Sequence, residues 1–166
     1  MVESGDLATW VGALATAVAG GFAGWQLLLL RRQQAAAAWA ELNGVAVTWV
    51  QKVKPNSPDP DGSALWVFEI TVHNPGRLPI RNVQVEMTFP VEVCRTHFDG
   101  TVDEPVRVVD VGLPVLAGAS HHTWERKLRM EFNEAHSLRT ISAHVTFLDL
   151  VGRTHSNVWG AADDGR

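Results

Sequence analysis

The segment Val83-Gln84-Val85-Glu86-Met87-Thr88-Phe89 alternates apolar and polar side chains along its whole length. In an extended strand, successive side chains point to opposite faces, so every second residue shares one face. One face of this segment should therefore lie on a core while the other faces water. Pro90 follows directly. Because proline has no amide hydrogen to give to a sheet, we expect the strand to end there.

The same alternation recurs on both sides of this segment, and loops rich in Pro, Gly, Asp and Ser separate the repeats. The expected strands lie near residues 45–50, 66–72, 91–97, 106–111, 124–130, 141–147 and 154–159. About seven or eight short strands without a helical period between them predict a mainly β domain, an antiparallel β-sandwich over residues 45–159. The expected core comprises Trp66, Phe68, Ile70, Val72, Val83, Val85, Met87, Trp124, Val145 and Phe147.

Two turn sequences give this domain a resemblance to known proteins. Ile70-Thr71-Val72-His73-Asn74-Pro75-Gly76, followed by Val83-Gln84-Val85 and then by Leu116-Ala117-Gly118, resembles bacterial immunoglobulin-like and fibronectin-like domains. In those domains an Asn-x-Gly turn joins two core strands and a Leu-x-Gly turn precedes a later one. The resemblance implies a two-sheet sandwich, and it implies no activity because such folds host many functions.

The N-terminal part of the chain has a different pattern. Residues 7–30 contain no charged side chain and no histidine. As a helix they would reach about 36 Å, more than the roughly 30 Å of a bilayer core, which predicts a single transmembrane helix. The expected organisation is a short N-terminus outside the cytoplasm (1–6), the span (7–30), a helical stalk (31–44), the β domain (45–159) and a flexible tail (160–166).

Charges beside this segment predict its orientation. Arg31 and Arg32 follow it, whereas the residues before it include Glu3 and Asp6 and no Lys or Arg. Basic residues near the ends of a span stay cytoplasmic, so the prediction is a cell-membrane protein with the N-terminus out and the C-terminal domain in the cytoplasm. Two alternatives stay open: a cleaved signal peptide with export of the domain, and a buried helix of a soluble protein.

Small residues recur every fourth position in the same segment, at Gly12, Thr16, Gly20 and Gly24. Small side chains at this spacing let two membrane helices approach closely. We therefore expect a helix–helix interface here, with a second copy or with another protein partner. The alternative is that a helix rich in Ala and Gly contains this spacing by chance.

Composition narrows the possible functions. The net charge of −4 does not favour nucleic acid as a partner, and the one cysteine, Cys94, cannot form an internal disulfide. Cys94 and His97 have opposite strand parity, and so do His121 and His122, so neither pair should share a face of a strand. We expect no metal, no cofactor and no catalytic residues.

Three basic residues, Arg126, Lys127 and Arg129, cluster near Trp124. They suit either contact with anionic lipid or a solvated strand edge whose charges prevent edge-to-edge pairing. Taken together, the sequence predicts a non-enzymatic, membrane-anchored binding or scaffold module in a protein complex. The alternatives are an exported adhesion module and a hydrolase, for which we find no sequence motif.

Overall fold

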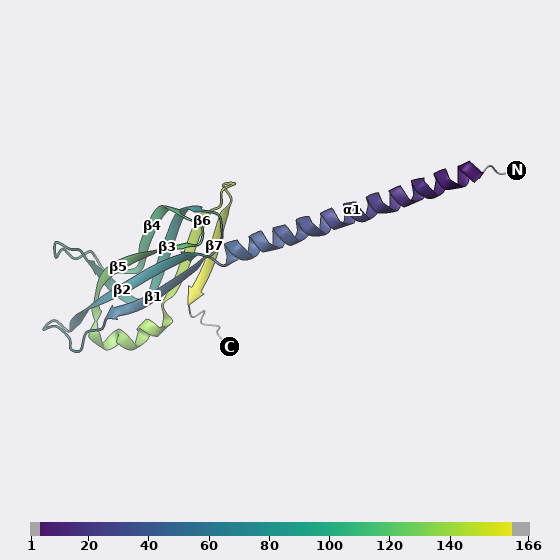
Figure 1. The fold of residues 1–166 in the computed structure, drawn as a ribbon. Coiled ribbons are helices and arrows are strands. Elements are labelled where there is room, and N and C mark those ends of the chain that lie inside the picture. The colour runs from purple at the N-terminus through teal and green to yellow at the C-terminus, as the bar shows by residue number, and fades with distance from the viewer. Residues whose placement is uncertain (1–3, 161–166) are drawn as a thin grey trace. The chain divides into compact units, whose positions relative to one another are not determined.

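The computed structural model describes residues 4–160, and within them the side chains of all residues except 4–17, 19, 35, 37 and 38. The chain divides into two compact units, residues 1–40 and 41–166. The first unit contains most of the helix α1, and the second contains the β domain (Figure 1).

Helix α1 runs from Ser4 to Asn43. Ala and Leu are its most frequent residues, and both are strong helix formers. It ends directly before Gly44, at the expected position, although Gly44 does not have the positive φ of a left-handed stop. The continuous helix predicted from the span into the stalk is therefore present.

The predicted membrane span, however, is contradicted. In the part of the chain that the structure describes, no helix is long and apolar enough to cross a membrane. Leu27 to Leu30 are followed at once by two arginines and two glutamines, and Gly and Ala dilute the apolar residues before them. The transmembrane helix over 7–30 and the single-pass localisation with a cytoplasmic domain are thus wrong. The orienting role predicted for Arg31 and Arg32 depended on that span.

Seven strands make up the β domain. Their bounds are β1 (Ala46–Val53), β2 (Ser63–Asn74), β3 (Ile80–Thr96), β4 (Val106–Leu116), β5 (Ser120–Glu131), β6 (Ser142–Leu148) and β7 (Thr154–Gly160). One element was not expected from the sequence, the 3-10 helix η1 (Phe132–Thr140), which joins β5 to β6. The mainly β prediction is confirmed, and the architecture is compatible with a sandwich.

All strand pairs are antiparallel, and β3 organises their order. The pairing path is β1-β2-β5-β3-β6-β7, with β4 also paired to β3. The first part of β3 pairs with β4 and β6, forming sheet B together with β7. Its last residues, Cys94 to Thr96, pair with β5, which belongs to sheet A together with β1 and β2. One strand is therefore shared by both sheets, and Figure 1 shows the strands wrapping around a common interior.

Pro90 lies within β3, so the expected end of the strand at this position is wrong. The register between β3 and β4 shifts between Thr88 and Val93, which brackets the proline. A residue without an amide hydrogen is tolerated where the pairing is irregular. Pro90 thus lies at an irregular point of β3 shortly before the strand passes from sheet B, where Val93 still pairs with Val106, to sheet A, where pairing begins at Cys94.

The interior between the two sheets is filled by the apolar residues of each strand. Trp66, Phe68, Ile70, Val85 and Phe147 are all almost completely buried. The predicted core is confirmed in every member except Trp124, which is only half-buried and packs against the core. The period of two was therefore a sufficient guide to which face of each strand is inside.

Two gaps in the pairing of this curled sheet differ in how they are filled. We call the gap between β1 and β7 the bridged seam, because side chains of β7 bridge it. Asn157 Nδ2 donates to the carbonyls of Leu42 (3.1 Å) and Val45 (2.9 Å), and Trp159 Nε1 donates to the carbonyl of Val45 (3.1 Å). We call the gap between β4 and residues 120–126 of β5 the open seam. In the described residues, no hydrogen bond joins these two strands.

Candidate functional site

The two turn sequences behind the immunoglobulin-like resemblance meet at one buried side chain. Asn74 is 2 % exposed, and its Nδ2 donates to the carbonyls of Leu78 and Ala117, each at 2.9 Å. Its Oδ1 accepts the amide of Gly76 at 3.1 Å. Gly118 lies so close to the carbonyl of Arg77 that a Cβ atom would not fit there. This corner is structural, because every polar atom of the asparagine side chain is used within the fold.

The structure separates the three basic residues that the sequence placed together. Arg129 is paired with Asp59 (3.0 Å) and Asp61 (3.4 Å). Lys127 lies over the ring of Phe98, 5.2 Å from its centroid. Arg126 lies opposite Phe68 in the register of β2 and β5, on the inner face of sheet A. These side chains do not form one basic surface.

Arg126 instead shares a hollow with Arg95, a residue that sequence reasoning missed. This hollow, called the arginine hollow below, lies where β3 leaves β5, and its volume is about 30 Å³. It is lined by Arg95, Thr96, His97, Phe98, Glu125, Arg126 and Lys127. Arg95 lies opposite Leu128, which is fully buried, so it too lies on the core side of its strand. The sequence did contain a signal for this hollow. Arg95 and Arg126 each occupy a position where the alternation of their strand places a side chain on the core face.

Several donors in the arginine hollow lack an acceptor. Arg126 Nη1 donates to the carbonyl of Glu125 at 2.9 Å, but its Nε is buried without a partner, as is Thr96 Oγ1. Burial, and to a smaller extent the positive charge of Arg95, lowers the pKa of Arg126. The site therefore has excess positive charge and unused hydrogen-bond donors, the properties of an anion-binding position.

The acidic side chains beside this hollow are occupied elsewhere. Glu125 Oε2 accepts a hydrogen bond from Lys52 Nζ at 3.0 Å on the outer face of sheet A. Asp103 Oδ1 lies 2.9 Å from His97 Nε2. Consequently neither carboxylate neutralises the two arginines.

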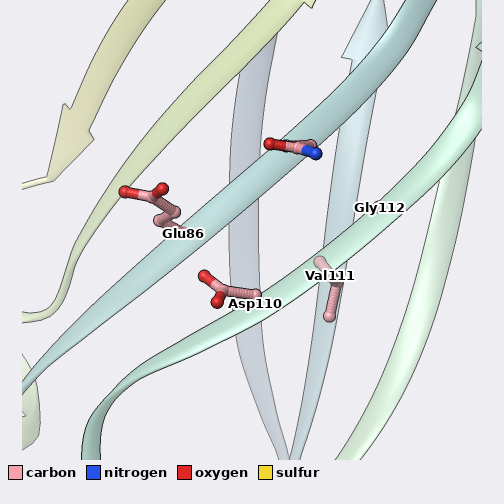
Figure 2. A pocket seen from close by; sticks show the side chains of 5 residues that line it. Glu86, Asp110, Val111 and Gly112 are labelled. Atoms are coloured by element: carbon pink, nitrogen blue, oxygen red, sulfur yellow. The ribbon is translucent and has the colours of Figure 1, made fainter.

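A second hollow, of about 250 Å³, lies on the outer face of sheet B between β3 and β4. Figure 2 shows that Glu86 and Asp110 extend from neighbouring strands, and the register places them directly opposite each other. Gly112 adds no side chain to this hollow, and His144 Nδ1 lies 3.7 Å from Glu86 on the other side. The carboxylates can accept hydrogen bonds from a cationic group. No cluster of three metal-ligating side chains occurs in the described part of the chain.

The histidines and the cysteine are distributed as strand parity predicts. His121 lies against His73, with ring centroids 5.7 Å apart, whereas His122 packs on Trp124 at 4.7 Å. Cys94 lies opposite Arg129 in the register of β3 and β5, while His97 contacts Asp103. The side chains of His121 and His122 therefore do not contact a common group, and neither do those of Cys94 and His97.

The small-residue positions of α1 stay a prediction. Around Gly20 and Gly24, a Cβ atom would find open space. The surroundings of Gly12 and Thr16 lie outside the described residues. Arg31 and Arg32 are exposed on the same helix.

Comparison with known proteins leaves the family open. No family model matches this chain, and no curated protein matches it. Several solved structures are similar in part, and two of them serve as examples. A protein proposed as ApaA from Bordetella pertussis is 11% identical, with 72% of this chain and 94% of that chain covered and a TM-score of 0.39. A GH20 exo-β-N-acetylglucosaminidase from Vibrio harveyi is 13% identical, with 70% and 17% covered and a TM-score of 0.41. Likenesses at this level do not bear on function.

Proposed function

We propose that the β domain is a non-enzymatic binding module that takes up an extended segment of a partner protein at the open seam. The observation that carries this proposal is the unpaired backbone of β4. This strand has 11 residues and pairs with β3 alone, so its other edge keeps its amide and carbonyl groups without strand partners. An exposed edge of this kind is a template for an added strand.

The side chains of β4 suit such an addition. Val106 and Val108 are 40 % and 44 % exposed, which leaves large β-branched surfaces beside the free edge. A partner strand would cover them, and cross-strand pairs of β-branched residues stabilise a sheet. Pro114 lacks an amide hydrogen, so we expect the usable edge to end before it.

We further propose an immunoglobulin-like or fibronectin-like class for the sandwich. What supports it is the Asn74 corner, where the Asn-x-Gly and Leu-x-Gly turns lie together. In this class the sheet edges and loops carry binding surfaces, which agrees with a role as a binding or scaffold module.

A peptide selection tests the proposed function. Twelve-residue peptides from a random display library are selected on the full chain, and amide hydrogen exchange locates the bound peptide. We expect protection along β4 and residues 120–126 of β5. Protection along β1 and β7 instead, or on none of the strand edges, would contradict the proposal.

A matched pair of variants sharpens this experiment. Val108→Lys places a charge beside the free edge of β4 and should weaken the selected peptides about tenfold. Val158 is 71 % exposed on β7, at the bridged seam, and serves as the control. Val158→Lys should leave affinity unchanged within about twofold. Equal effects of both variants would remove the distinction between the two seams.

A further inference from the structure

We infer that the arginine hollow binds a carboxylate side chain of the segment taken up at the open seam, an inference that rests on the proposed function. The partner is thus an acidic peptide segment. Its Asp or Glu side chain would accept hydrogen bonds from Arg95 and Arg126, with Thr96 as a third donor.

The placement of the two arginines connects the hollow to the open seam. Pairing of β5 with β3 begins at Lys127, opposite Thr96, so Arg126 is the first residue of β5 on the unpaired side. A strand added along residues 120–126 of β5 would therefore end against the arginine hollow. A side chain near the end of that strand can reach the two guanidinium groups without a change of fold.

The unused donors show what kind of group the hollow lacks. In the described part of the chain, the Arg95 side chain has no hydrogen-bond or ion-pair partner. Arg126 and Thr96 line the same hollow, and Arg126 Nε and Thr96 Oγ1 are buried without a hydrogen-bond partner. Buried donors without acceptors are unfavourable, and an anionic oxygen satisfies several at once.

The charge balance points to an anion rather than to a neutral acceptor. Arg95 and Arg126 repel each other, and the neighbouring carboxylates of Glu125 and Asp103 are held by Lys52 and His97. An incoming negative charge would relieve this repulsion in a partly desolvated place, where charge pairs are stronger than on an open surface.

Size favours a carboxylate over a phosphate. The hollow has a volume of about 30 Å³, enough to admit a water-sized polar group. The fork of a guanidinium group can bind either anion, but a planar carboxylate needs less room than a tetrahedral phosphate.

Capped tripeptides test this inference separately from strand addition. The full chain is titrated with Ac-Gly-Glu-Gly-NH2, with Ac-Gly-Gln-Gly-NH2 and with inorganic phosphate, while the Nε–H resonances of the arginines are followed by NMR. We expect the Glu peptide to shift the signals of Arg95 and Arg126, and the Gln peptide to leave them in place. Phosphate binding that is tighter than that of the Glu peptide would overturn the assignment to a carboxylate.

Variants identify the residues that bind. Arg126→Gln and Arg95→Gln should each weaken the Glu peptide about tenfold, because each removes one charged partner. Arg107 is an exposed arginine on β4 that does not line the hollow, so Arg107→Gln is the control and should change affinity less than about twofold. A loss of the same size in all three variants would mean nonspecific attraction and would overturn the inference.

The two proposals can fail independently. Library peptides that protect β4 but show no preference for Asp or Glu would overturn the acidic partner and leave strand addition in place. Conversely, specific shifts with the Glu tripeptide, without protection of β4 by any library peptide, would overturn strand addition. The hollow would then stand as a carboxylate site alone, and its link to a partner strand would be lost.

Discussion

At the bridged seam, side chains of β7 donate hydrogen bonds to carbonyls of the chain that enters β1, whereas at the open seam no hydrogen bond of the described residues joins β4 to β5. Both pairs of strands approach each other to a similar extent. The difference lies in the residues: Asn157 and Trp159 are donors that find acceptors, while Arg126 Nε is a buried donor that lacks one. A curled sheet can thus close one side with its own side chains and leave another for a ligand.

Loss of Trp159 should have the largest effect on this comparison. Trp159→Ala removes an aromatic ring packed against the core and the hydrogen bond to the Val45 carbonyl. We expect the free energy of unfolding to fall by about 3 kcal/mol in urea denaturation. Val158→Ala, at the exposed neighbouring position, should change it by less than about 0.5 kcal/mol. Similar values for the two variants would show that the seam is not closed by Trp159.

Asn157→Ala is expected to have the next largest effect. It removes the side-chain donor of the Leu42 carbonyl and leaves the Val45 carbonyl with Trp159 Nε1 alone, at a cost of about 2 kcal/mol in the free energy of unfolding. Faster amide exchange in β1 and β7, relative to β4, would locate the damage at the bridged seam. Ser156→Ala on the outer face of the same strand is the control. Unchanged exchange in β1 would contradict a bridging role for Asn157.

Removing a donor at the open seam should raise the free energy of unfolding, whereas removing one at the bridged seam should lower it. Arg126→Met removes a buried Nε–H without a partner and the repulsion with Arg95, while retaining an aliphatic side chain. We expect the free energy of unfolding to rise by up to about 1 kcal/mol. Arg107→Met should have no measurable effect. A destabilisation as large as that of Asn157→Ala would mean that the Arg126 guanidinium is satisfied within the fold.

A pH experiment gives the smallest effect. Asp149 lies in the turn between β6 and β7, and hydrogen bonds from His155 first, and then from the amide of Arg153, lower its pKa. Because the folded-state pKa lies below the unfolded value of about 3.9, this carboxylate stabilises the fold above that pH. The contribution is lost as pH falls through the folded-state value. Asp149→Asn should therefore reduce the acid dependence of the denaturation midpoint.

A control separates the turn from acid stability in general. The pKa of Asp61 is likewise lowered, mainly by hydrogen bonds from Ser63, at a turn that does not carry β7. Asp61→Asn should also reduce the acid dependence. It should not speed amide exchange along β7, whereas Asp149→Asn should. Equal amide exchange rates along β7 in the two variants would show that the Asp149 turn does not stabilise the bridged seam.

The period of two in the sequence was enough to place most of the core but not the connections between strands. Val83, Val85 and Met87 are buried on the face that their alternation indicated. Pro90 was predicted to end its strand, because proline has no amide hydrogen. In the structure it lies inside the longer strand β3, at a point where the pairing with β4 is irregular and no amide hydrogen is needed. Residues 132–140 have no strong apolar period, so η1 left no sequence signal.

The arginine hollow could not be predicted from the sequence, for a related reason. Arg126 was grouped with Lys127 and Arg129 because they are close in sequence, but neighbours on a strand point to opposite faces. Its spatial partner, Arg95, comes close only because β3 leaves sheet B and joins sheet A.

The sharing of β3 by both sheets also has a consequence for how the domain folds and opens. Neither sheet can lose β3 without exposing the other, so the two sheets cannot act as separate cooperative units in the way that stacked, independent sheets can. Native-state hydrogen exchange should therefore give one global opening for β2, β3, β5 and β6. Because β3 pairs with β4, β5 and β6, the last of which begins 46 residues after the end of β3, its register depends on distant contacts, and refolding should be slow for a domain of this size.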